Sequence, residues 1–369
     1  MKVDGRARRT IWREAGAQAV QVIDQRELPH RWRVQVLGTL EHACTAIAQM
    51  WVRGAPLIGV TAAYGMALQC VADASDEALG HARVLLDSTR PTAVNLAWAT
   101  RRMHEALLPM APAQRATAAW ALADAMAEED VAVNAAIGEH GLVVLRDRAA
   151  ARRHDGAALQ ILTHCNAGWL ATVDWGTALA PIYSAHEAGL AVHVWVDETR
   201  PRNQGASLTA WELAQAGVPH TVIADNTGGH LMQRGQVDVV IVGADRVSAR
   251  GDVCNKVGTY LKALAARDND VPFYAAVPCS TLDLGIDDGV AGIPIEARSP
   301  REVTHISGRD AHGSIVEVQL TPDGSPALNV GFDVTPARLV SGLITERGVV
   351  SPSDVHLLGR MVSPQRPSR

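Results

Sequence analysis

Polar and nucleophilic residues follow five apolar, strand-length segments in the second half of the chain. In chain order they are residues 159–163 before His164, Cys165 and Asn166, residues 191–196 before Asp197, residues 220–224 before Asp225 and Asn226, residues 237–242 before Asp245, and residues 272–277 before Cys279, Ser280 and Thr281. The carboxyl ends of parallel strands meet at one edge of an open sheet, and ligands bind at that edge. A single aspartate such as Asp197 or Asp225 is most simply a helix N-cap. Five such strand ends together indicate a ligand site.

Two of these residues are candidates for proton transfer. Asp245 ends the run VDVVIVGAD, the most clearly buried strand by composition. Desolvation of a carboxyl group raises its pKa and favours the protonated acid at neutral pH, which suits a proton donor. Cys165 is a buried packing thiol in one interpretation, the usual fate of cysteine. Its place at a strand end, before Asn166 and Gly168, favours a functional role.

Cationic residues in three segments could bind an anion. Arg53 precedes Gly54, a residue that lets the backbone approach a ligand closely, although Arg53 could instead form a structural ion pair. Arg90 precedes Pro91, so extended backbone and then a helix entry are expected there. Lys256 is expected to open a helix, where the helix dipole disfavours a cation unless an anion is bound. A surface lysine is the alternative.

Several common signatures are absent from the sequence. No strand is followed by G-x-G-x-x-G, which disfavours a dinucleotide-binding domain. GAPLIGVT has the glycine spacing of a phosphate-binding P-loop, but Val60 replaces the required lysine. There is no H-E-x-x-H or G-x-S-x-G motif, and the histidines show no metal-ligand spacing. The sequence therefore predicts no metal and no cofactor.

The chain should fold as an α/β protein with two parts. Helical spacing of apolar residues predicts helices over residues 55–72, 93–110 and 113–138, with short strands near 20–24 and 32–36. Strands then alternate with helices, such as 206–216 and 256–266, which implies a parallel, doubly wound, Rossmann-like sheet. The charged run at residues 146–155 is a plausible boundary. We expect a mostly helical domain over residues 1–147 that contributes substrate-binding residues, and a catalytic domain over residues 148–369.

The net charge, the cysteines and the N-terminal residues together indicate a cellular compartment and the kinds of partner to expect. The formal net charge of −5 argues against a nucleic-acid partner, because phosphate backbones select basic surfaces. The five cysteines are scattered without a C-x-x-C, as expected in a reducing cytoplasm. The N-terminus lacks the apolar core of a signal peptide, and the longest continuous apolar runs are of strand length. We therefore expect a soluble, cytoplasmic protein with no membrane partner.

Five motifs together resemble one family. They are RGAPLIG at residues 53–59, STRPTAVNL at 88–96, THCNAG at 163–168, DETRPRNQGASL at 197–208 and GADRVSARGDVCNKVGTY at 243–260. The set resembles the methylthioribose-1-phosphate isomerase family, which belongs to the wider group containing the alpha, beta and delta subunits of translation initiation factor 2B. The resemblance extends from about Leu40 to Ser351.

The resemblance implies a role for each matching position. Cys165 matches the catalytic cysteine and Asp245 the proton-donating aspartate. The substrate-binding positions match Arg53, Gly54, Ala55, Arg90, Gln204, Asn255 and Lys256. Cys254 and Cys279 stand where smaller or hydroxyl-bearing residues are common, a difference that leaves the chemistry intact. A homodimer that needs no cofactor is also implied.

The implied reaction is the conversion of 5-methylthioribose 1-phosphate into 5-methylthioribulose 1-phosphate in methionine salvage. Two alternatives stay open. One is a related isomerase acting on 5-deoxyribose 1-phosphate or ribose 1,5-bisphosphate, which would differ around the C5 substituent. The other is a non-catalytic regulatory subunit of the same fold. Retention of both Cys165 and Asp245 favours an enzyme.

Overall fold

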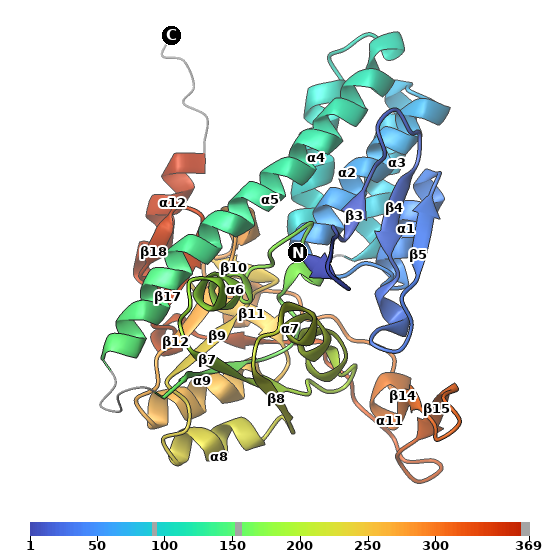
Figure 1. Cartoon of the computed structure of the whole chain (residues 1–369). Coiled ribbons are helices and arrows are strands. Elements are labelled where there is room, and N and C mark those ends of the chain that lie inside the picture. Colours follow the sequence, from blue (N-terminus) through green and yellow to red (C-terminus); the bar gives the residue numbers. More distant parts are fainter. Residues whose placement is uncertain (91–93, 152–156, 363–369) are drawn as a thin grey trace.

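The architecture joins a helical N-terminal part to a larger α/β part, as expected (Figure 1). The structure is a computed structural model that describes residues 1–90, 94–151 and 157–362. The α/β part is built on a seven-stranded sheet. Its strands, in spatial order, are β18 (Gly348–Val350), β17 (Gly342–Thr345), β12 (Phe273–Ala276), β9 (Val239–Val242), β6 (Leu159–Thr163), β7 (Val192–Asp197) and β8 (His220–Ile223).

The order of these strands defines a doubly wound sheet. All neighbouring pairs from β17 to β8 are parallel, and only β18 is antiparallel. The chain builds outward from β6 through β7 to β8, then returns to the other side of β6 with β9 and β12. The direction therefore reverses between β6 and β9. The five predicted strands and their shared carboxyl edge are confirmed.

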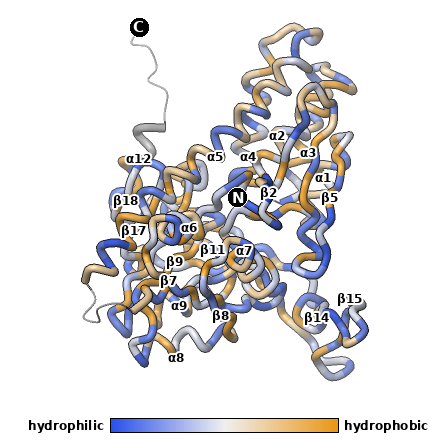
Figure 2. Tube along the Cα trace, in the orientation of Figure 1, coloured by the Kyte–Doolittle hydropathy of each residue, from blue (hydrophilic) through white to orange (hydrophobic). Residues whose placement is uncertain are grey.

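Burial explains why these segments are strands. β9 reads VVIV and all four residues are buried, which suits a central parallel strand covered on both faces. Apolar residues form one cluster on each face of the sheet and a third among the N-terminal helices. Figure 2 shows hydrophobic segments in both parts of the molecule. The helices beside the sheet are α6 (Ala180–Glu187), α7 (Ala210–Ala216), α8 (Thr227–Gln233), α9 (Thr259–Asp268) and α12 (Val355–Val362).

The helical part also carries small N-terminal sheets. Its helices are α1 (Leu40–Ala48), α2 (Ala55–Ala72), α3 (Asp76–Thr89), α4 (Val94–Leu107) and α5 (Pro112–Ala150). The N-terminal strands are β1 (Lys2–Val3), β2 (Arg6–Ala7), β3 (Ile11–Trp12), β4 (Val20–Ile23) and β5 (Val34–Leu37). Thr39 and Ser75 cap α1 and α3 by accepting from backbone N–H groups. The predicted helices and the two predicted strands in this region are present.

Helix α5 runs from the helical part to the sheet (Figure 1) and is longer than the sequence predicted. It continues beyond Gly138 through the first half of the charged run, and residues 152–156 lie outside the described part of the chain. Gly141 lets it approach α6, because a Cβ there would lie 2.3 Å from Pro181 Cγ. The helix contributes side chains to both the N-terminal apolar cluster and a cluster at the sheet. Because it ends at Ala150, residue 148 falls within its last turn. The division at that residue stays a prediction.

By length and composition, α2 is the single helix among the described residues that could cross a membrane. Counting continuous apolar runs did not reveal it, because residues such as Thr61 and Gln69 interrupt the run. Yet 83% of this helix is buried. Its side chains form the core of the N-terminal cluster, so packing inside the protein accounts for its apolar character.

The remaining elements surround the carboxyl edge of the large sheet. A four-stranded sheet contains β13 (Leu282–Asp283), β10 (Arg246–Ser248), β11 (Val253–Lys256) and β16 (Phe332–Thr335). A hairpin of β14 (His305–Arg309) and β15 (Ile315–Gln319) projects from the body (Figure 1). Short helices are α10 (Gly289–Gly292), α11 (Arg301–Thr304), η1 (Gln25–Glu27), η2 (Trp169–Ala171), η4 (Cys279–Thr281), η5 (Ala337–Leu339) and η6 (Pro352–Asp354). The predicted helix 206–216 begins as a π-helical segment, η3 (Gly205–Thr209), before α7.

Candidate active site

The sheet places Cys165 and Asp245 on either side of its switch point. Cys165 follows β6 by two residues, and Asp245 follows the neighbouring strand β9. In doubly wound sheets the crevice at this reversal is where ligands bind. The topology therefore brings both predicted catalytic residues to the favoured position.

The backbone of Cys165 is held in a left-handed conformation, with a φ of 68°. This conformation is uncommon for a residue with a side chain and is found at constrained sites. The Cys165 N–H donates to Thr199 Oγ1 at 2.8 Å, and its carbonyl accepts from Thr209 Oγ1 at 2.7 Å. Both bonds hold the backbone of Cys165, a residue that is only 7% exposed.

Arg53 reaches this thiol from the helical part. Its Nη2 lies 4.0 Å from Cys165 Sγ and donates to the Asn166 carbonyl at 2.7 Å, while Nη1 donates to Asn166 Oδ1. The acceptors on Asn166 are neutral, so these hydrogen bonds do not neutralise the positive charge of the buried guanidinium beside Cys165. An anion or a developing negative charge would be stabilised there.

Asp245 as a residue is partly buried. Burial raises the pKa of Asp245 above its ordinary value, while the positive charges of Lys256, Arg90 and Arg53 act to lower it. The direction agrees with the sequence-based expectation. A carboxylic acid that keeps its proton toward neutral pH can act as a proton donor.

Lys256 does not open a helix, so that prediction was wrong. It is the last residue of β11, which pairs with β16, and α9 begins only at Thr259 after a turn through Gly258 with a φ of 104°. Lys256 Nζ donates to the Gly331 carbonyl at 2.9 Å. Burial lowers the pKa of Lys256, and the nearby Cys165 and Asp245 act to raise it. The ammonium group is thus buried beside the two predicted catalytic residues.

The N-terminus of α2 packs against η2, which follows the Cys165 segment. Gly54 has a φ of 89°, and a Cβ on it would lie 2.4 Å from the Ala171 carbonyl oxygen. Only glycine fits this contact. Ala55 is the first residue of α2, and the N–H groups of a first helical turn have no carbonyl partner within the helix. Gly54 and Ala55 therefore offer backbone donors beside Arg53.

The remaining predicted binding residues, Arg90, Asn255 and Gln204, are all buried. Arg90 is buried and lies 3.5 Å from Glu296 through Nη2, and burial lowers its pKa. The Pro91 that follows it lies outside the described residues. Asn255 Nδ2 donates to Thr259 Oγ1 at 3.0 Å. Gln204 is buried at the start of η3, and its Oε1 has no partner among the described residues.

A cavity of about 390 Å³ opens beside Arg53 and Gln204. Its walls come from the N-terminal part, from the segment before η3, and from the β14–β15 hairpin. Representative lining residues are Leu28, Met50, Asn203, Glu302 and Ile306. The volume is sufficient for a small phosphorylated sugar. Of the predicted site residues, Arg53 and Gln204 line this cavity, whereas Cys165 and Asp245 are not among its lining residues.

Three polar residues near the site were not assigned from the sequence. Glu212 on α7 is fully buried and accepts from Asn166 Nδ2, Tyr183 Oη and two backbone N–H groups. It therefore supports the asparagine that holds Arg53. Glu296 pairs with Arg90, and His164 precedes Cys165. Of these three, His164 alone had a local signal, because it belongs to the THCNAG motif.

Two strand-end aspartates do not cap helices. Asp197 instead bonds to His164 at 2.8 Å and to Lys262 at 3.2 Å. Asp225 accepts from the N–H groups of Thr199 and Arg200. The N-cap explanation was therefore wrong for both. Cys279 lies apart from these groups, with its N–H donating to Glu346 and its pKa raised to about 12 by burial.

Comparison with known proteins identifies the family. The model of the initiation factor 2 subunit family matches residues 51–352. This chain belongs to that family. Within it, methylthioribose-1-phosphate isomerase of Paramagnetospirillum magneticum is 61% identical over 97% of this chain and 98% of its own length. The enzyme of the same name from Methylocella silvestris is 61% identical over 95% of each chain.

Solved structures of family members have the same fold. The 5-methylthioribose 1-phosphate isomerase of Pyrococcus horikoshii OT3 is 38% identical, covers 96% of both chains and superposes with a TM-score of 0.81. A protein from A. fulgidus described as the delta subunit of translation initiation factor eIF-2B is 39% identical over 94% of this chain and 97% of that chain, with a TM-score of 0.76. The family thus includes proteins described as enzymes and as translation factor subunits.

Proposed function

We propose that this chain is an aldose–ketose isomerase that converts 5-methylthioribose 1-phosphate into 5-methylthioribulose 1-phosphate in methionine salvage. The observation that carries the proposal is the arrangement of Cys165 and Asp245 across the switch point, with Arg53 beside the thiol. The isomerases at 61% identity and nearly full coverage support the same substrate. We assign substrate binding to Arg53, Gly54, Ala55, Arg90, Gln204, Asn255 and Lys256.

The first step is opening of the furanose ring. The bond between C1 and the ring oxygen breaks as Asp245 transfers its proton to that oxygen. The raised pKa of Asp245 supports this role because the proton is retained until it is needed. The phosphate on C1 stays attached throughout. The cations Arg53, Arg90 and Lys256 would hold it and stabilise negative charge.

Hydrogen then moves from C2 to C1. In one route Cys165 removes it as a proton, an enediol phosphate forms, and a proton returns at C1 while the C2 hydroxyl loses its proton to the enzyme to give the ketone. In the other, hydrogen passes directly from C2 to C1 as a hydride, and the C2 hydroxyl loses its proton to give the ketone. In that case Cys165 would stabilise the charge that develops near C1 and C2. Both routes conserve all atoms and require no external oxidant or reductant.

Substitution of the catalytic pair tests the proposal. Cys165→Ser and Asp245→Asn preserve shape, so both variants should melt like the wild type and retain substrate affinity. Each should lose at least roughly 10²-fold in kcat, the lower range for a positioned acid–base group. The double variant should lose far less than the product of the two single effects, because both groups serve one reaction sequence.

Steady-state kinetics, a binding titration and a thermal melt on the wild type and three variants give the answer. Normal melting with nearly normal turnover in one single variant would remove that residue from the mechanism.

A non-catalytic regulatory subunit is the second candidate, favoured by the 39% identity to the A. fulgidus protein. Absence of turnover by the folded wild type would favour that alternative.

We further propose that the protein is a cytoplasmic homodimer whose partner molecule is a small sugar phosphate, with no nucleic-acid or membrane partner. All five cysteines are unpaired, which agrees with a reducing compartment. An uncovered apolar stretch on and just after β15 supports self-association, since Val316 and Val318 on the strand and Leu320 after it are 38%, 48% and 53% exposed.

A further inference from the structure

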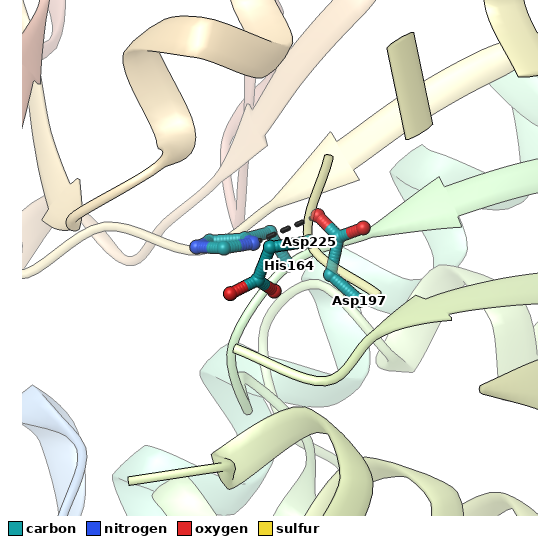
Figure 3. Close-up of side chains that lie close together, drawn as sticks. All are labelled: His164, Asp197 and Asp225. Atoms are coloured by element: carbon teal, nitrogen blue, oxygen red, sulfur yellow. Dashed lines mark hydrogen bonds and ion pairs between the residues drawn. The ribbon is translucent and has the colours of Figure 1, made fainter. Parts of the chain in front are cut away.

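The imidazole of His164 is buried between the Asp197 carboxylate and the turn that follows Lys256. Its Nδ1 lies 2.8 Å from Asp197 Oδ2, and its Nε2 lies 2.9 Å from the Val257 carbonyl oxygen. Figure 3 shows the ring directed at the Asp197 carboxylate, with Asp225 beside the pair. A carbonyl oxygen can only accept, so Nε2 must carry a hydrogen and donate it to Val257. His164 is only 1% exposed, and both of its ring nitrogens have hydrogen-bond partners.

Donor atoms of His164, Asp197 and Asp225 lie within 4.8 Å of one another, a spacing that would suit a metal ion. The contacts favour a hydrogen-bonded network instead. Both ring nitrogens are already used, and Asp225 accepts from two backbone N–H groups. The ammonium of Lys262 lies 3.2 Å from Asp197 Oδ2, so a cation already neutralises this buried carboxylate.

The bond from Nε2 reaches the turn that follows Lys256. Val257 lies between Lys256 and Gly258, and a Cβ on Gly258 would lie 3.0 Å from the His164 ring. Asp333 fixes the other side of this turn by accepting from the N–H of Gly258 at 2.6 Å. The turn that carries Lys256 is thus held between His164 and Asp333.

The same network also fixes Cys165. The Asp197 carboxylate bonds to His164, and the Asp197 carbonyl accepts from Thr199 Oγ1 at 2.9 Å. Thr199 Oγ1 in turn accepts from the Cys165 N–H at 2.8 Å. Strands β6, β7 and β11 are therefore linked through short contacts on one side of the site.

We propose that His164 is a positioning residue that ties the turn after Lys256 to the strand end that carries Cys165. The inference rests on the proposed function for its substrate and on the observed contacts for its geometry. His164 itself touches no reacting atom. Its contribution is to keep the buried ammonium at a fixed place relative to the thiol and so to hold the substrate phosphate.

Two amide variants separate the two hydrogen bonds of the ring. His164→Gln can place an N–H near the Nε2 position and keep the bond to Val257. His164→Asn can place an N–H near the Nδ1 position and keep only the bond to Asp197. We expect His164→Asn to raise KM for 5-methylthioribose 1-phosphate by about 10-fold, the effect of losing one such bond, with little change in kcat. His164→Gln should recover most of this loss.

A second readout does not depend on turnover. In amide hydrogen exchange, the peptide over residues 253–260 should exchange faster in His164→Asn than in the wild type or His164→Gln. If the wild type fails to convert the substrate, the proposed function fails, and this exchange experiment still decides the positioning role. His193→Asn is the matched control, because His193 lies on the neighbouring strand β7 and bonds to Thr221 instead. It should change neither KM nor exchange.

Asp197→Asn extends the test if His164→Asn does not fold. An asparagine oxygen can still accept from Nδ1, so positioning predicts nearly unchanged kinetics. A large loss of kcat at constant KM in Asp197→Asn would instead make the pair part of the proton-transfer machinery and overturn the proposal. Wild-type KM and wild-type exchange in His164→Asn, or equal impairment of the Gln and Asn variants, would also overturn it.

Discussion

Burial and charge act in opposite directions on the ionisable groups around Cys165. Burial raises the pKa of Asp245 and lowers that of Lys256, whereas the attraction between the two groups opposes both shifts. An acid that keeps its proton and a cation that lies beside it are both needed for a reaction that opens a ring next to a phosphate. The residue types could be predicted from the motifs, but their mutual burial depends on the fold.

Arg90 and Lys256 should contribute to binding the phosphate. A hydrogen bond to a charged group is worth roughly 1.5–3 kcal/mol, so Arg90→Ala and Lys256→Ala should each weaken affinity for the sugar phosphate by about 10- to 150-fold. Calorimetric titration measures this directly. Unchanged affinity would mean that the Arg90 contact with Glu296 and the Lys256 contact with Gly331 are purely structural.

Among the helices and strands, those with a strong local sequence pattern were predicted correctly, whereas a strand that depends on pairing with a distant segment was not. The strands of the large sheet were predictable because runs such as VVIV at β9 are apolar throughout. Lys256 was misassigned because the residues after it have helical spacing, while the strand that pairs with it, β16, lies some 75 residues later in the chain. The π-helical turn of η3 has no sequence signal of comparable strength.

Glu212 shows a further limit of local pattern. Its helix, α7, was predicted, but the buried partners of this carboxyl group come from the residues after β6, from η2 and from α6. Nothing in the sequence near Glu212 indicates four donors directed at it. The residue supports Asn166, and through it the guanidinium of Arg53.

The stability of this element should depend on pH. Burial raises the pKa of Glu212 to about 7, above its ordinary value of 4.5. The folded state therefore holds this proton more tightly than the unfolded state, so the stabilisation is complete below about pH 4.5 and is lost as pH rises to about 7. Glu212→Gln should lower the unfolding free energy by about 1–3 kcal/mol, because its amide N–H groups would face other donors.

Urea unfolding of both proteins at pH 5 and pH 8 checks this expectation. The wild type should lose more stability than Glu212→Gln between the two pH values, since the glutamine does not titrate. Identical pH dependence in the two proteins would contradict the assignment of a raised pKa to Glu212.

At the scale of the whole molecule, the sheet brings together residues from distant segments. Arg53 comes from the helical part, Cys165 from β6 and Asp245 from the strand beside it. The strand ends share one edge of the sheet as predicted, but Cys279 after β12 lies apart from the site around Cys165. Which other side chains contact Cys165 and Asp245 could not be predicted, because packing between the helical part and the α/β part determines those contacts.

We expect a homodimer in solution. The apolar stretch on and just after β15 would be covered by association, and permanent interfaces commonly bury on the order of 2,000 Å² or more. Sedimentation at micromolar concentration should therefore give a species of twice the chain mass of 39.3 kDa. A single species at the mass of one chain would refute the dimer.

The most direct test of the central claim is a substrate comparison with the purified wild-type protein. NMR can follow 5-methylthioribose 1-phosphate, 5-deoxyribose 1-phosphate and ribose 1,5-bisphosphate, each in buffer that contains EDTA. We expect conversion of the methylthio sugar into its ketose 1-phosphate, with the highest kcat/KM of the three and without added metal. No conversion of any sugar, a clear preference for the bisphosphate, or activity that returns only with a divalent ion would contradict this claim.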